Sequence, residues 1–449
     1  MKIILSFLIF VFAIKVWCQV ETPDTTMIQV ETPQKDRDRP DSTDRIDALQ
    51  AEPDTIIIPF NSNVMSKNRL GSEPDKNKML LMNINVQIDA TQAVNDMYNF
   101  KFKKAEKQFT WLKQKFPDHP LPYFLLGLSQ WWKIVPNLNN EAFDFKPLDK
   151  IFHAYMDTTI VKAEKIYKNS SGSIKIEAAF FLGGAYGFKA RVYSDRKMWR
   201  KATFASKNAF HYLQESKGHN DLSPEFLFGE GLYNYYAVWI PENYVLLRPI
   251  VALFPDGDKE LGIKQLREVS LNAFYTRTEA QYHLMRIYAN EEDNLNAAFQ
   301  ISEYLAQTFP DNAYFQRFYA RLTFVKGKQS KTENISLSIL EKIDKNMPGY
   351  EDISGRYAAF FLGHIYSYKY KDFKKAQYYF RRAVQFGENI KAYDSYYYLS
   401  SLAHIARIAD KEGDKKIAKI YYRILSRRTK KKDDFYKEAK NYLGRKKEK

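Results

Sequence analysis

The sequence predicts an all-α fold in which antiparallel helix pairs stack into a helical-hairpin solenoid. After the N-terminal fifth of the chain, apolar residues recur at spacings of three and four, as at Ala376, Phe380 and Ala383, and no long alternating run predicts strands. The helical segments are short and end at Pro, Gly, Asp or Asn, which is typical of paired antiparallel helices. The phrase AAFFLG also begins at both Ala178 and Ala358, which indicates an internal repeat.

Residues 1–18 are predicted to be a secretory signal peptide. Lys2 is followed by an apolar stretch that is too short to span a bilayer. Cleavage after Cys18 would leave a mature chain without cysteine, because the sequence contains only one, and so without disulfides or thiolate metal sites. Lipidation of Cys18 is the alternative, although Trp17 directly before it fits a lipobox poorly.

Residues 19–84 have the composition of a disordered acidic linker. Asp, Thr and Pro recur, and the segment from Gln19 to Phe60 has ten acidic and four basic residues. Such a segment cannot bury a core. Two of its Asp-Thr sites, at Asp24 and Asp54, resemble the O-glycosylation signal of exported Bacteroidetes proteins. Asp-Thr is equally common in acidic linkers that carry no sugar.

The body of the chain contains a repeated spacing. The segment that begins at Ala105 has Leu and Pro seven and twelve residues later, and the segment that begins at Ala298 has the same spacing. Gly127, Gly183 and Gly363 each follow a leucine in the helix that would come first in its pair. These positions resemble the tetratricopeptide repeat, a helix-turn-helix unit of about 34 residues.

The resemblance covers residues 85–428 with about five recognisable units, and it implies a right-handed superhelix. A small residue on the first helix lets its partner approach closely, and an alanine on the second helix fills the opposite side. Residues 133–170 and 187–210 exceed the repeat length and are predicted to be divergent inserts. The residues expected at these packing contacts are Ala105, Gly127, Gly183, Ala298, Gly363, Ala376 and Ala418.

Residues 429–449 are predicted to form a basic helix end and tail. From Arg427 to Lys449 there are eleven Lys and Arg against four Asp and Glu, and the whole chain carries a formal charge of +16. A charge of this sign favours polyanions or a membrane surface as an alternative partner. Export argues against nucleic acid. A solvated, lysine-rich helix end explains the same charges without any ligand.

No motif predicts catalysis, a cofactor or a metal site. The seven histidines do not show metal-ligand spacing, and there is no phosphate-binding loop or nucleophile elbow. Carboxylates such as Glu225 and Glu230 could in principle serve as the acid and base of a helical-toroid hydrolase. Only the helical composition supports that second alternative, so we expect a protein that is not an enzyme.

Two regions are predicted to bind a partner. The concave face of the superhelix is built from first helices, and aromatic side chains there are good anchors for a peptide or a helix. The irregular stretch Gly231–Ser270 combines aromatic residues with an apolar segment and predicts an apolar groove or a membrane-surface contact. For every one of these residues, packing in the core is the alternative. The predicted binding residues are Trp131, Trp132, Tyr235, Tyr236, Trp239, Arg248, His283, His364 and Tyr368.

The sequence is thus identified as resembling exported tetratricopeptide proteins of the Bacteroidetes envelope. That resemblance implies a scaffold in the periplasm, or at the periplasmic face of the outer membrane, that serves secretion or outer-membrane assembly. Its partner would be another envelope protein or peptide. No oligomeric state follows from these patterns.

Overall fold

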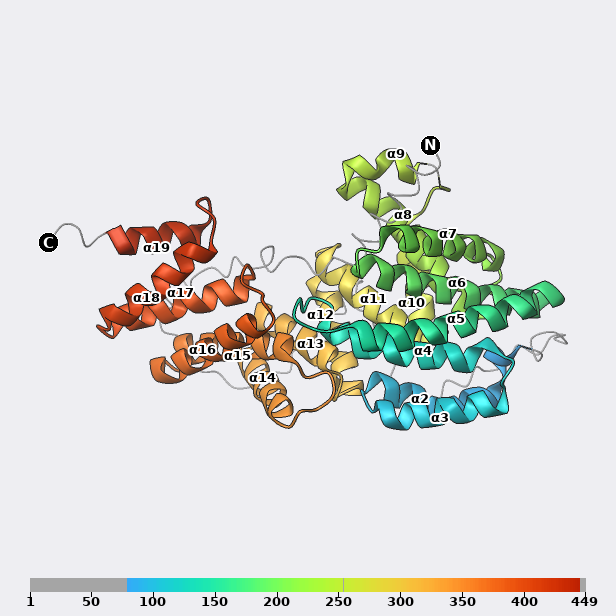
Figure 1. Cartoon of the computed structure of the whole chain (residues 1–449), viewed down its shortest axis with the longest axis horizontal. Helices are drawn as coiled ribbons and strands as arrows, with labels where there is room; N and C mark the ends of the chain where they lie inside the picture. The colour runs from blue at the N-terminus through green and yellow to red at the C-terminus, as the bar shows by residue number, and fades with distance from the viewer. Residues whose placement is uncertain (1–78, 253, 445–449) are drawn as a thin grey trace, which may run out of the picture.

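The computed structural model describes residues 79–252 and 254–444, and within these ranges the chain is helical without strands. From α2 to α7 and from α10 to α19 each helix packs against the next along the chain, and α8 packs against α10 across the short α9. This arrangement is consistent with a helical solenoid and agrees with the predicted all-α class (Figure 1). No helix in the described ranges is long and apolar enough to span a membrane.

The helices are α2 (Ile84–Tyr98), α3 (Phe102–Lys115), α4 (Pro120–Ile134), α5 (Lys146–Asn169), α6 (Gly172–Asp195), α7 (Trp199–Ser216), α8 (Leu227–Asn243), α9 (Arg248–Val251), α10 (Lys259–Asn272), α11 (Arg277–Asn290), α12 (Leu295–Thr308), α13 (Ala313–Val325), α14 (Gln329–Asp344), α15 (Asp352–Tyr368), α16 (Phe373–Asn389), α17 (Tyr396–Lys411), α18 (Lys415–Arg428) and α19 (Asp434–Gly444). Short 3-10 turns are η2 (Leu80–Met82), η3 (Val135–Asn137), η4 (Pro224–Phe226) and η5 (Val245–Leu247).

Polar N-caps set many of these helix starts. Asn312 accepts a hydrogen bond from the backbone N–H of Phe315, and Asp372 accepts one from Lys375. Asp414 does the same at the start of α18. Each cap satisfies one of the backbone donors that the first helical turn leaves without a partner. The Asp and Asn positions that separate the helical segments in the sequence therefore have a direct structural role.

The residues expected at the packing contacts lie inside the helix pairs. Ala105, Ala298, Ala376 and Ala418 are fully buried. A Cβ at Gly363 would lie 2.7 Å from the ring of Phe380 on α16. A Cβ at Gly127 would lie 2.6 Å from Met156 on α5. A Cβ at Gly183 would lie 3.7 Å from the backbone of α7, which is an ordinary contact, so the expected close approach does not require glycine there.

Two glycines lie at the contact between α8 and α10. A Cβ at Gly262 would lie 2.5 Å from the backbone nitrogen of Tyr235 and 2.7 Å from the carbonyl oxygen of Gly231. Backbone atoms cannot move aside as a flexible side chain can. The two glycines therefore allow α8 and α10 to pack at a distance that larger residues would prevent.

The N-terminal helix pairs fold back onto helices far along the chain. Asn312 Nδ2 donates to the carbonyl of Tyr98 at 2.7 Å, and the N–H of Asp311 donates to Asn99 Oδ1 at 2.8 Å. Arg317 also donates to the carbonyl of Pro136, at 3.3 Å. We call the helix pairs from α2 to α13 the closed part of the molecule. The later pairs extend from it toward the C-terminal end, on the left in Figure 1.

Closure explains why α11 is buried on all sides. Every residue from Thr278 to Ala289 is buried. A solenoid helix that contacted only its neighbours would leave one stripe exposed. The concave surface expected in this part of the chain is therefore filled by the chain itself.

The two predicted inserts are mostly helix. Residues 133–170 contain η3 and the 24-residue α5, and residues 187–210 contain the end of the 24-residue α6 and the start of α7. The extra length therefore extends the stacked helices instead of forming loops.

The ends of the described chain differ from the expected boundaries. Met79 and Leu81 are fully buried, and the N–H of Leu81 donates to Glu177 Oε1 at 2.6 Å. The last residues of the predicted linker thus belong to the folded body. In the predicted tail, α19 packs on α18, where the rings of Tyr422 and Tyr442 stack at 4.4 Å. The signal peptide, the rest of the linker and residues 445–449 lie outside the described residues.

Candidate functional site

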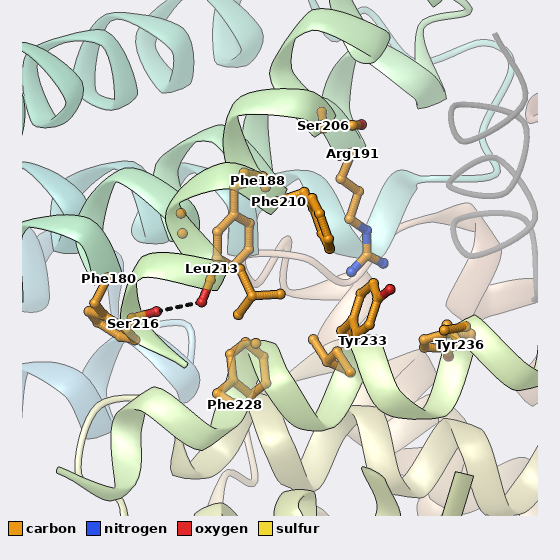
Figure 2. A pocket seen from close by; sticks show the side chains of 18 of the residues that line it. Phe180, Phe188, Arg191, Ser206, Phe210, Leu213, Ser216, Phe228, Tyr233 and Tyr236 are labelled. Atoms are coloured by element: carbon orange, nitrogen blue, oxygen red, sulfur yellow. Dashed lines mark hydrogen bonds between the residues drawn. The ribbon is translucent and has the colours of Figure 1, made fainter. Parts of the chain in front are cut away.

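An apolar cavity of about 230 Å³ lies between the α6–α7 pair and α8. Phe188 of α6, Phe210 and Leu213 of α7, and Phe228 of α8 point into it (Figure 2). Val251 and Phe254, from the connection between α8 and α10, also line it. Concave, mostly apolar spaces with a few converging polar groups are the usual form of small-molecule sites.

Glycines form part of the cavity wall. Gly183, Gly184 and Gly187 lie on α6, and Gly229 lies on α8. A Cβ at Gly187 would meet no atom within 4 Å, and one at Gly183 would make only ordinary contacts of 3.7 Å. A glycine inside a helix costs about 1 kcal/mol relative to alanine. At these two positions close packing does not require glycine, so the main effect of the missing side chains is to widen the cavity.

A buried polar cluster adjoins one end of the cavity. It consists of Arg191, Glu279, Tyr282, His283 and Arg286, all of which are buried. Arg191 and Arg286 both donate to Tyr282 Oη, at 3.2 and 2.8 Å. The guanidinium of Arg191 also lies 4.4 Å from the ring centre of Trp131, which is a cation–π distance. Arg191 and His283 line the cavity itself.

Carboxyl groups in and beside the cluster are hard to ionise. Trp132 Nε1 donates to Glu279 Oε1 at 2.6 Å, and Tyr98 Oη donates to the same oxygen at 3.3 Å. Burial nevertheless raises the pKa of Glu279 to about 7. Burial also raises the pKa of Glu291, which accepts a hydrogen bond from Tyr236 Oη, to about 7. Burial therefore opposes the ionisation of both carboxyl groups, although the arginines beside them favour it.

A second group of side chains lies on α13, the last helix of the closed part, and on α15 and α17 of the later pairs. We call Phe324 of α13, His364 and Tyr368 of α15, and His404 of α17 the aromatic strip. The ring of His364 lies 5.0 Å from Phe324, 4.4 Å from Tyr368 and 6.2 Å from His404. Tyr368 is 38% exposed, and His364 and Phe324 are half-buried. The strip therefore presents aromatic surface to solvent.

Most of the predicted binding residues are core residues, which corrects their assignment to an open face. Trp131 and Trp132 are fully buried because closure places them against other inner helices. Tyr235, Trp239 and His283 are buried as well, and Tyr236 is buried with its ring at the cavity. Their direct contact with a protein partner would require opening the fold.

The other three predicted binding residues stay accessible. His364 and Tyr368 meet in the aromatic strip. Arg248 is exposed and donates from Nε to the carbonyl of Pro241 at 2.8 Å. Arg248 lies on the connection between α8 and α10, far in sequence from the aromatic strip. Leu246 on the same connection is 88% exposed.

The charged members of the cavity site, Arg191, Glu279 and Glu291, were not among the predicted residues. Charged residues of a helix ordinarily lie on its solvent face, so the neighbouring sequence does not indicate that these three are buried. The Gly183-Gly184 pair followed by Gly187 is a signal that was available. Three glycines within five residues of a helix are unfavourable unless space is needed there.

The two carboxylates weighed as a hydrolase pair have separate partners. Glu225 accepts hydrogen bonds from the backbone N–H groups of Phe274, Tyr275 and Thr276. Glu230 accepts one from Gln265 Nε2 at 2.8 Å. Among the described residues, no group of three or more His, Cys, Asp or Glu is placed to hold a metal ion.

We expect the buried His404 to weaken the fold in acid. Burial lowers its pKa from 6.5 to about 3, with the nearby Arg407 and His364 contributing. Below pH 6.5 the unfolded chain takes up a proton that the folded chain refuses, so stability falls as the pH drops from about 6.5 toward about 3. Above pH 6.5 this contribution to stability is complete.

The variant His404→Phe should lose less stability between pH 6.5 and pH 4 than the wild type. The losses of unfolding free energy in the two proteins should differ by about 1.4 kcal/mol per pH unit. The phenylalanine ring can still stack on Phe380, whose ring lies 4.7 Å from that of His404. Urea unfolding at several pH values measures it. Equal losses in the two proteins would contradict the assignment.

Comparison with known proteins assigns no family to the chain. A scan against protein-family models finds no match, and a search of curated proteins finds no similar sequence.

Proposed function

We propose that the chain is an exported, non-catalytic repeat protein of the tetratricopeptide type that binds another envelope protein. The superhelix would be right-handed, as that resemblance implies. The aromatic strip is the contact site in this proposal. It is supported by one observation: in the closed part the inner surface is filled, whereas Tyr368 and His364 remain accessible on the inner helices beyond it.

The chemistry of the strip suits a protein ligand. Half-exposed aromatic rings supply large contact area at little cost in conformational entropy, and they are common anchors in interfaces. Arg407, at the edge of the strip on α17, is held by two hydrogen bonds to Glu438 of α19, at 2.7 and 2.5 Å. This arrangement favours an extended peptide or a helix laid across α13, α15 and α17.

Site-specific photo-crosslinking in the native envelope tests the proposal. We would place p-benzoylphenylalanine at Tyr368, and at Tyr378 as the matched control. Tyr378 is 56% exposed on α16, outside the strip. The expected result is one defined protein adduct from position 368 and none from position 378.

Loss of that adduct on His364→Ala would support the strip as the site. No protein adduct at position 368, or the same adducts from both positions, would contradict the proposal.

A further inference from the structure

We propose that the apolar cavity binds one fatty acid, with its alkyl chain between α6, α7 and α8 and its carboxylate at Arg191. This site is separate from the aromatic strip and does not depend on the function proposed above. The ligand class follows from the shape, the walls and the charge of the cavity.

The shape and the walls suit an alkyl chain. Figure 2 shows Phe180 and Ser216 at one end of the cavity and Arg191 with Tyr236 at the other. Phe188, Phe210 and Leu213 lie between these ends. An apolar wall of this kind gains free energy when it covers methylene groups that water would otherwise surround.

The glycines indicate that the space is needed. Alanine at Gly187 would meet no neighbouring atom within 4 Å, and it would favour the helix by about 1 kcal/mol. If only stability mattered, alanine would therefore be the better residue at this position. Glycine at this position leaves room for a ligand, and a loss of stability of this kind is common at binding sites.

A buried arginine at the polar end of the cavity can bind an anion. Arg191 is buried and lines the cavity, and a guanidinium binds a carboxylate through two parallel hydrogen bonds. Tyr236 and His283 line the same end of the cavity, and Arg286, Glu279 and Glu291 lie beside them without lining it. Burial lowers the pKa of His283, so the ring adds no positive charge at this end at neutral pH.

A free fatty acid fits this end better than a phospholipid. Arg191 is only 3% exposed, and its neighbours Trp131 and Tyr282 are fully buried. A compact carboxylate can replace water at such a position, whereas a glycerophosphate headgroup needs far more room. We therefore commit to the free acid.

Displacement of a fluorescent fatty acid from the delipidated full chain tests the proposal. Cis-parinaric acid is the probe, and palmitate, hexadecanol and lysophosphatidylcholine are the competitors. Palmitate should displace the probe, and the alcohol and the lysolipid should each be at least about tenfold weaker. Equal potency of the alcohol would overturn the role of Arg191, and stronger displacement by the lysolipid would overturn the choice of ligand.

The variant Gly187→Leu should fill the cavity and weaken probe binding at least about tenfold. The matched control is Gly444→Leu, at the exposed end of α19, where an added Cβ also meets no atom within 4 Å. It should bind the probe as the wild type does.

Thermal unfolding of Gly187→Leu distinguishes a filled cavity from a damaged fold, because an alkyl side chain in the cavity should raise the melting temperature. A variant that binds the probe as tightly as the wild type would overturn the proposed site. If Gly187→Leu does not fold, the competitor series on the wild type still decides the question.

Discussion

Trp132→Ala should lower the free energy of unfolding by about 5 kcal/mol, the largest effect expected from one substitution. The indole is fully buried, and its ring lies 5.2 Å from Tyr98, 5.5 Å from Tyr282 and 5.3 Å from Phe315. These partners belong to α2, α11 and α13, so one side chain joins three inner helices. Alanine would leave a cavity at that junction and would remove a donor from the buried Glu279.

Urea unfolding followed by circular dichroism measures this loss. Trp111→Ala is the matched control, because Trp111 is 40% exposed on α3, where Lys115 Nζ lies 4.8 Å from its ring centre. It should cost less than about 1 kcal/mol. Equal effects of the two substitutions would show that Trp132 is not a central contact of the fold.

Glu225→Ala should cost about 4 kcal/mol, because it removes the acceptor for the start of α11. The carboxylate accepts hydrogen bonds from three consecutive backbone N–H groups, at 2.7, 2.8 and 2.9 Å. It also accepts one from Thr276 Oγ1 at 2.5 Å. Glu225 lies in η4 and is buried, so water cannot replace it. Each buried donor left without a partner costs about 1–3 kcal/mol.

Hydrogen exchange gives this prediction a local readout. In Glu225→Ala the amides of Phe274, Tyr275 and Thr276 should exchange much faster, and in Glu225→Gln they should stay partly protected because one oxygen remains. Glu230→Ala, which removes a single bond to Gln265, is the control and should leave these amides protected. Unchanged exchange in Glu225→Ala would contradict the capping role.

Local signals were sufficient to predict the helices. The spacing of apolar residues and the caps at Asn312 and Asp372 depend on residues within one turn of each other, so the sequence displays them directly. The small residues at Gly127 and Gly363 likewise indicate contacts within one helix pair. The all-α class and the sequential stacking follow from such patterns.

The candidate sites were harder to predict, since they depend on contacts between distant parts of the chain. Trp132 and Tyr368 occupy comparable inner positions, yet closure buries the first and leaves the second accessible. The contact of Trp132 with Glu279 spans 147 residues. Nothing in the neighbouring sequence of either residue indicates it. The polar side chains beside the cavity were missed for the same reason.

A double-mutant cycle between Trp132 and Glu279 tests closure most directly. Trp132→Phe and Glu279→Gln would be unfolded singly and together, because the two residues touch only if α4 and α11 pack across the interior of the closed part. We predict a coupling free energy of at least about 1 kcal/mol. A coupling below about 0.3 kcal/mol, as expected for residues that do not touch, would contradict the closed arrangement.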